Sequence, residues 1–186
     1  MTPDGGTPTA RQERFQKVAH EVEGPVFRFV RRRASREIAD EVLADTLLVL
    51  WRRLDEVTAG GEIAYCLGVA RRSLANRLRS DSRQNRLIGR LASSFTVGDL
   101  PTPAAETSEN TALHDALDHL PRGDREVLTM WAWDGLEARE IGVVLDITAN
   151  AAAIRLHRAK NRLREDLERK KLFPTGQSSS GSTETR

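Results

Sequence analysis

Apolar residues recur at helical spacing over residues 135–167 of the chain. Ile141 and Val144 give a first short helix one apolar face, and residues 146–148 form a turn in which Thr148 is a favourable N-cap. The second helix carries apolar residues at steps of four and three, which places them on one face: Ala152, Leu156, Ala159, Leu163 and Leu167. The pattern predicts two helices joined by a tight turn.

The other faces of this second helix are basic. They carry Arg155, Arg158, Lys160, Arg162 and Arg164 before the first acidic residue appears. A short helix, a turn and a basic helix are typical of a helix-turn-helix, whose second helix enters the major groove of DNA. A basic amphipathic helix taken alone is equally consistent with a solvated charged face. The turn and the preceding helix favour DNA.

The rest of the chain also shows helical periodicity and no strand pattern. Helices are expected over residues 10–23, 26–33, 36–54 and 62–80. Gly24-Pro25 is expected to end the first helix and separate it from the second. Trp51 is expected in the core; Trp131 and Trp133 cannot share one helix face, so one is expected in the core and the other at an interface. The chain is predicted to be all-α, with two small helical domains and a flexible linker. The predicted segments are a disordered N-terminus (1–10), a first domain (11–90), an acidic linker (91–111), a helix-turn-helix domain (112–172) and a disordered tail (173–186).

Composition and charge narrow the possible functions. No apolar run is long enough for a transmembrane helix, the N-terminus does not resemble a signal peptide, and Cys66 is the only cysteine. The net charge of +2 conceals a basic segment over residues 11–90, with 17 Lys or Arg against 11 Asp or Glu. Residues 91–118 hold five Asp or Glu and no Lys or Arg. Two basic segments flanking an acidic one predict two modules that face nucleic acid in a cytoplasmic protein.

No catalytic motif supports an enzyme. The four histidines are scattered, and the sequence has neither a phosphate-binding glycine loop, a nucleophile motif nor Cys/His spacing for zinc. The prediction is a non-enzyme without metal or cofactor.

Three segments in sequence order resemble the extracytoplasmic-function (ECF) group of bacterial sigma-70 factors. ADEVLADTLLVLWRRL resembles family region 2.2, AYCLGVARRSLANRLR resembles regions 2.3 and 2.4, and the segment from LPRGDREVL to RAKNRLR resembles region 4. The resemblance spans roughly residues 11–172. It implies a region 2-like helical bundle and a region 4-like helix-turn-helix domain.

The resemblance also implies binding surfaces. Region 2.2 binds a coiled coil of the polymerase β′ subunit, and the matching residues here are Asp40, Glu41, Asp45 and Leu48. Contacts to the −10 element are expected from Arg71, Arg72, Asn76 and Arg79. Contacts to the −35 element are expected from Asn150, Ile154, Arg155, Arg158 and Arg162. Ala151-Ala152-Ala153 replaces a common threonine-valine-lysine of the family, so Arg155 and Arg158 are expected to be the principal −35 contacts.

The implied function is that of an RNA polymerase sigma factor that selects promoters and assists −10 melting. Its implied partners are core polymerase (the β′ coiled coil and the β flap), double-stranded and melted promoter DNA, and an anti-sigma factor. The resemblance also implies a cytoplasmic protein that associates with the nucleoid when it is active. Two alternatives stay open from the residues alone: a helix-turn-helix regulator that does not engage core polymerase, and a sigma mimic that sequesters an anti-sigma factor.

Overall fold

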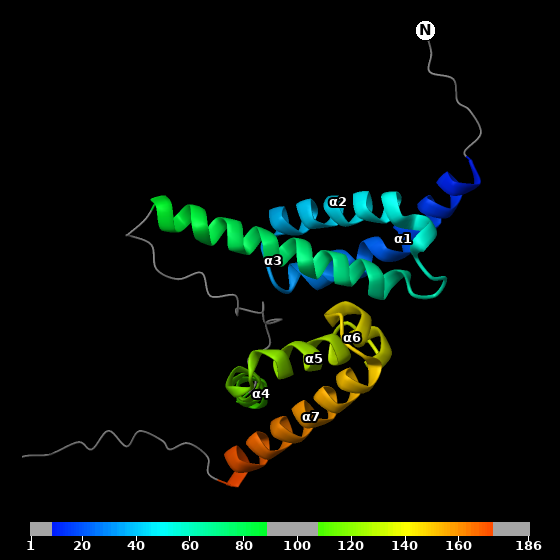
Figure 1. Cartoon of the computed structure of the whole chain (residues 1–186). Coiled ribbons are helices and arrows are strands. Elements are labelled where there is room, and N and C mark those ends of the chain that lie inside the picture. The colour runs from blue at the N-terminus through cyan, green and yellow to red at the C-terminus, as the bar shows by residue number, and fades with distance from the viewer. Residues whose placement is uncertain (1–8, 89–107, 173–186) are drawn as a thin grey trace, which may run out of the picture.

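The computed structural model describes residues 9–88 and 108–172, and every regular element in these ranges is helical, as predicted. The N-terminal bundle consists of α1 (Ala10–Arg31), α2 (Arg36–Arg53), the short 3-10 helix η1 (Leu54–Glu56) and α3 (Glu62–Ile88). The C-terminal bundle consists of α4 (Ser108–His119), α5 (Arg122–Ala132), α6 (Ala138–Leu145) and α7 (Ala149–Leu172). Figure 1 shows the two bundles one above the other, with α3 and α6 at the junction.

The start of α1 is fixed by a reciprocal cap. The amide of Gln12 donates to Thr9 Oγ1 at 3.3 Å, and the amide of Thr9 donates to Gln12 Oε1 at 2.6 Å. Residues 1–8 of the predicted disordered N-terminus and all of the predicted disordered tail lie outside the described residues. Most of the predicted linker lies outside them too, although α4 begins at Ser108 within its range.

The expected interruption at Gly24-Pro25 is wrong, because α1 runs through both residues. Proline lacks an amide hydrogen, so the helix loses one internal hydrogen bond at this position. Burial on both sides of Pro25 offsets that cost: Val18 and Val22 precede it and Phe29 follows it in the same core.

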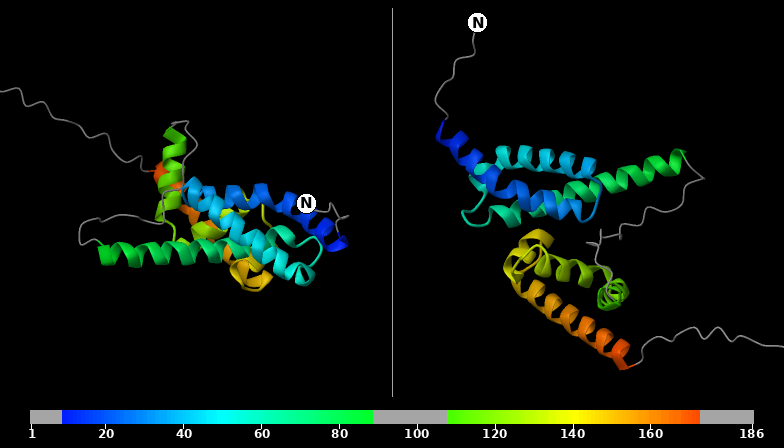
Figure 2. Two further views of the ribbon diagram at one scale, coloured as in Figure 1. Left: turned by 90° about the horizontal axis from the view of Figure 1, so that it is seen from above. Right: turned by 180° about the vertical axis from the view of Figure 1, so that it is seen from behind.

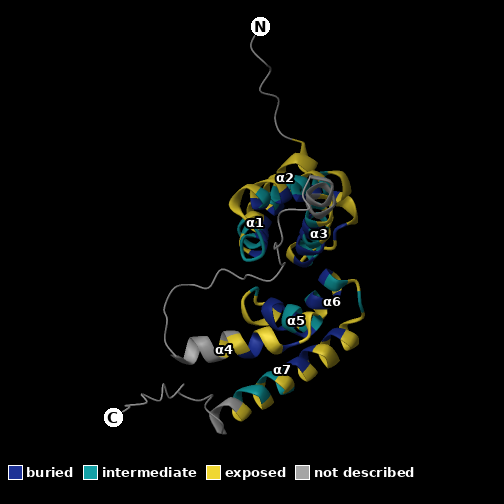
Figure 3. Ribbon diagram, turned by 90° about the vertical axis from the view of Figure 1, so that its left-hand side faces the viewer, coloured by how far each residue is buried: buried dark blue, intermediate teal, exposed yellow. Residues whose placement is uncertain are grey.

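Each bundle buries its own apolar stripe. Phe29, Leu50, Leu54 and Leu67 are fully buried among α1, α2, η1 and α3, where the three long helices pack pairwise. In the C-terminal bundle, α7 packs on α4, α5 and α6 (Figure 2). Helix α7 is buried toward α5 and α6 and exposed on its opposite side (Figure 3). The predicted buried face of α7 is therefore confirmed at Ala152, Leu156 and Ala159.

The tryptophans differ from expectation. Trp131 and Trp133 are 45% and 42% exposed, so neither belongs to the core. The buried face of α5 is supplied by Val127, Leu128 and Met130 instead, and Trp131 stacks under Lys160, whose Nζ lies 3.4 Å from the ring centroid. Trp51 is half-buried and packs edge-on against Phe15.

Of the helices within residues 9–88 and 108–172, none combines the length and apolar character needed to cross a lipid bilayer.

Candidate nucleic-acid interface

The turn between α6 and α7 is built by a small set of backbone contacts. Asp146 takes the left-handed conformation, with φ 57° and ψ 48°, and ends α6. The amide of Ile147 donates to the Gly142 carbonyl at 3.0 Å, as in a Schellman motif. A Cβ on Gly142 would lie 2.9 Å from the Ile147 carbonyl oxygen, so glycine is what allows the turn to approach α6.

Helix α7 begins with the predicted cap. The amide of Ala151 donates to Thr148 Oγ1 at 3.1 Å, and the amide of Ala152 donates to the Thr148 carbonyl at 3.0 Å. At the other helix, the amide of Glu137 donates to Glu140 Oε2 at 2.8 Å and secures the start of α6. Both helix starts of the predicted helix-turn-helix are therefore held by side-chain hydrogen bonds.

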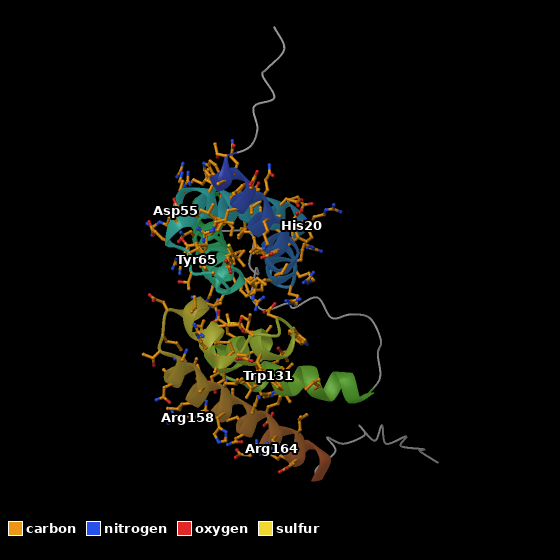
Figure 4. All side chains as sticks on the ribbon, turned by 90° about the vertical axis from the view of Figure 1, so that its right-hand side faces the viewer. His20, Asp55, Tyr65, Trp131, Arg158 and Arg164 are labelled. Atoms are coloured by element: carbon orange, nitrogen blue, oxygen red, sulfur yellow. The ribbon has the colours of Figure 1, made fainter. Side chains whose placement is uncertain are left out.

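The structure brings the predicted −35 residues onto the outer side of α7. Asn150, Ile154 and Arg158 follow one another at steps of four and are exposed, Ile154 at 44%. Arg155 is exposed beside them, and within residues 9–88 and 108–172 neither Arg155 nor Arg158 forms an ion pair. Figure 4 shows Arg158 on α7, on the side of the molecule remote from the N-terminal bundle.

Arg162 is the exception in this group. Its guanidinium pairs with Asp124 of α5, whose side chain is nearly buried. The contact joins the middle of α7 to the first turn of α5. Arg162 therefore serves the packing of the C-terminal bundle in this structure.

The predicted −10 residues have a different environment, because α3 faces the C-terminal bundle. Arg71 donates from Nε to Glu126 Oε1 at 2.7 Å and from Nη2 to Glu126 Oε2 at 3.2 Å. These hydrogen bonds raise the pKa of Arg71 and hold its guanidinium group against Glu126 of α5. Arg79 donates to Asn76 Oδ1 at 2.7 Å, and Arg72 is exposed at the junction. One of the four predicted −10 residues, Arg71, is thus engaged within the protein.

A second ionic contact closes the same junction. Asp134, which follows α5, pairs with Arg32 and Arg33 at the end of α1, and its side chain is only 3% exposed. Burial, with repulsion from Arg32 and Arg71, lowers the pKa of Arg33 to about 10, and its guanidinium lies 3.7 Å from the Phe29 ring centroid. Sequence reasoning missed Asp134 and the role of Arg32 and Arg33, since no local pattern links residues a hundred positions apart.

The predicted core-polymerase residues lie along α2. The side chain of Asp40 is exposed, and its ion pair with Arg36 is long, with 3.9 Å between Arg36 Nε and Asp40 Oδ2. Asp45 accepts from Arg77 Nη2 at 2.6 Å and from Ser73 Oγ at 3.0 Å, while Glu41 also pairs with Arg77. The Arg77 guanidinium, with Ser73, holds the pKa of Asp45 below its ordinary value. Two of the three predicted acidic residues, Glu41 and Asp45, are therefore paired with Arg77 of α3. Leu48, 49% exposed, is the prominent exposed apolar residue of α2.

Comparison with known proteins matches a segment of the C-terminal bundle to a described family. Residues 110–163 match the family described as Sigma-70, region 4. The chain is 29% identical over 167 residues to the RNA polymerase sigma factor CarQ of Myxococcus xanthus, covering 86% of this chain and 90% of that protein.

Two solved structures share the fold. One is the sigma factor RpoE in complex with the anti-sigma factor NepR from Bartonella quintana, with a TM-score of 0.58, 20% identity and coverage of 83% of this chain and 96% of that one. The other is CnrH in complex with the cytosolic domain of CnrY, with a TM-score of 0.52, 19% identity and coverage of 83% and 88%. At these identities the likeness concerns the fold alone.

Proposed function

We infer that this chain, which belongs to the extracytoplasmic-function group of bacterial sigma factors, directs core RNA polymerase to specific promoters and assists opening of the −10 region. The family is not an enzyme family, so the polymerase performs the chemistry. The observation that carries the proposal is the exposed face of α7, where Arg155 and Arg158 are free of ion pairs within the described ranges.

The −35 element is proposed to bind this face of α7. Arginine can donate two hydrogen bonds to guanine, asparagine can pair with adenine, and an aliphatic side chain can pack on a thymine methyl group. Arg158, Asn150 and Ile154 supply these three kinds of contact from successive turns. Arg155 lies beside them, where it can reach a base or a phosphate.

The −10 element is proposed to bind α3 through Arg71, Arg72, Asn76 and Arg79. Holding a melted strand needs a cationic path for its phosphates and space for unstacked bases. Since Arg71 is bound to Glu126 and α3 faces α6, this function requires the two bundles to separate. The compact arrangement is therefore proposed to be a resting form.

Core polymerase is proposed to bind the outer side of α2, with Leu48 supplying apolar burial and Asp40 an accessible charge. The polymerase elements proposed are the β′ coiled coil for the N-terminal bundle and the β flap for the C-terminal bundle. The two structural relatives were solved with NepR and with the cytosolic domain of CnrY. By analogy, an anti-sigma factor is proposed to bind this chain and hold it inactive in the cytoplasm. When the anti-sigma factor releases the chain, it is proposed to act at the nucleoid.

The test is transcription in vitro with purified core polymerase. Core enzyme alone and core enzyme plus this protein are compared on a library of promoter-length genomic fragments, and new transcripts are mapped to their start sites. Specific transcripts that depend on the protein support the proposal. Binding to DNA without binding to core polymerase would identify a regulator, and binding to neither would identify a mimic; either result overturns it.

A further inference from the structure

A cavity of about 350 Å³ lies between the two bundles, and arginines dominate its wall. Arg32 and Arg33 enter it from the end of α1. Helix α3 contributes Arg71, Arg72 and Arg79, and α5 contributes Arg122 and Arg125. Seven arginines from both bundles therefore line one volume.

Among the described residues that line the cavity, Glu126, which binds Arg71, is the only acidic one. Asp134 pairs with Arg32 and Arg33, and Asp118 pairs with Arg125, so the arginines of the wall still outnumber these acidic partners. Within the described ranges, Arg72 and Arg122 form no ion pair. A surplus of cations around a shared space favours an anionic occupant.

The guanidinium groups of Arg32 and Arg125 are held by Asp134 and Asp118, and the Nε of each is buried without a hydrogen-bond partner. The cations beside the cavity are therefore fixed in place without being fully satisfied. Burial and the repulsion of neighbouring arginines lower the pKa of Arg33. An anion in the cavity would relieve that repulsion and offer acceptors to the wall.

We propose that this cavity binds a small organic polyphosphate of the nucleotide class. Guanidinium groups recognise phosphate through paired N–H donors, and several converging arginines suit more than one phosphate group. Leu74, Ala75 and Leu78 form an apolar wall on α3 against which an organic moiety can pack. The volume falls within the range of small-molecule sites and is far too small for a DNA duplex.

Binding would have a structural effect, because no single bundle supplies the whole site. A polyphosphate held by Arg72 of α3 and Arg122 of α5 connects the two bundles and stabilises their closed arrangement. If the proposed function holds, the same ligand also competes with −10 DNA for Arg71, Arg72 and Arg79. The intracellular concentration of this nucleotide-class ligand would then set how readily the protein binds a promoter.

The experiment is a calorimetric titration of the full-length chain with GTP and, separately, with pyrophosphate. One GTP per chain is expected, with weaker binding of pyrophosphate because it lacks the organic moiety. Arg72→Gln and Arg122→Gln should each weaken GTP binding about tenfold, as expected for the loss of a charge-assisted contact. Arg52→Gln, on exposed α2, removes the same charge outside the cavity and should leave the affinity unchanged.

Three results would overturn the proposal. GTP binding could be absent. It could be lost in Arg72→Gln but not in Arg122→Gln, which would place it on the DNA-facing side of α3 alone. It could fall equally in Arg52→Gln, which would mark it as nonspecific. Equal affinity for pyrophosphate would overturn the role of the apolar wall. None of these titrations depends on transcription, so failure of the proposed function is separately visible.

Discussion

Arg71 of α3 and Glu126 of α5 form a two-point ion pair, with 2.7 Å between Nε and Oε1 and 3.2 Å between Nη2 and Oε2. The pair connects the N-terminal bundle to the C-terminal bundle across 55 positions of sequence. It also occupies an arginine that the proposed function assigns to DNA. Together with the Asp134 contacts and the packing of α3 on α6, this pair therefore sets how easily the side of α3 that carries Arg71 becomes accessible.

Glu126→Gln should shift the protein toward separated bundles. The pair is partly exposed, so its loss is expected to change the closed-to-open equilibrium by about 1 kcal/mol, or roughly fivefold. Small-angle scattering should report a larger radius of gyration, and single-stranded DNA should bind more tightly. Glu168→Gln, an equal charge change on exposed α7, is the control. A scattering curve identical to that of the parent chain would contradict the prediction.

Arg155→Ala and Arg158→Ala should each weaken binding of a −35 duplex. Loss of a base contact is expected to cost about 1–3 kcal/mol, or roughly 5- to 150-fold in Kd. Fluorescence anisotropy over a series of salt concentrations separates base contacts from phosphate contacts, since only the latter reduce the salt slope. Arg169→Ala, whose native residue pairs with Asp166 near the end of α7, should bind like the parent. Parent-like affinity in both test variants would remove this face from the proposal.

Gly142→Ala and Gly123→Ala place the same methyl group on two helical glycines and should have opposite effects. At Gly142 the Cβ meets the Ile147 carbonyl oxygen at 2.9 Å, so the turn must shift at a cost of about 1–3 kcal/mol. At Gly123 the Cβ meets nothing within 4 Å, and alanine should stabilise α5 by about 0.5–1 kcal/mol. Urea unfolding measures both. Equal stability of the two variants would show that the close approach at Gly142 is not needed.

Leu48→Asp should weaken binding to core polymerase without unfolding the protein. Leu48 is exposed on α2, so a carboxylate there remains hydrated in the free chain but would be buried in the proposed complex. The expected loss is about 1–2 kcal/mol, or roughly 5- to 30-fold in Kd. Ile63→Asp, at an exposed apolar residue on α3, is the matched control. Unimpaired core binding by Leu48→Asp would exclude this part of α2 from the interface.

Asp45→Asn should change the acid stability of the N-terminal bundle. Arg77 holds the pKa of Asp45 below its ordinary value, so the pair stabilises the fold above about pH 4 and loses that effect as pH falls through the lower folded pKa. The asparagine variant should therefore be less stable at pH 7 and show a shallower loss of stability below pH 4. Thermal unfolding between pH 2 and 7 measures this. An acid limb as steep as the parent's would contradict it.

Local sequence was sufficient to predict the helix-turn-helix, because its determinants are close together. Thr148 caps a helix that begins at the next residue, and Ala152, Leu156 and Ala159 lie on the buried face that their spacing indicates. The break at Pro25 was predicted wrongly, since burial of Val22 and Phe29 outweighs one missing hydrogen bond.

The junction between the bundles was beyond local reasoning. Glu126 and Asp134 are ordinary polar residues near one helix, and nothing in their spacing indicates that they bind Arg71 and Arg33. The tryptophans show the same limit. One of Trp131 and Trp133 was expected in the core, but both are exposed, and Lys160 of another helix stacks on the ring of Trp131.

Arg71 cannot hold Glu126 and a DNA phosphate at the same time, so under the proposed function the junction competes with −10 DNA for one guanidinium group. Separation of the bundles raises the affinity of α3 for DNA by a certain factor, and DNA on α3 must favour separation by that same factor. The −35 face of α7 is already exposed in the closed arrangement, so −35 DNA that binds both arrangements equally leaves this balance unchanged. The junction is therefore proposed to tune −10 binding alone, and a sequence change that weakens it would strengthen −10 binding without altering −35 binding.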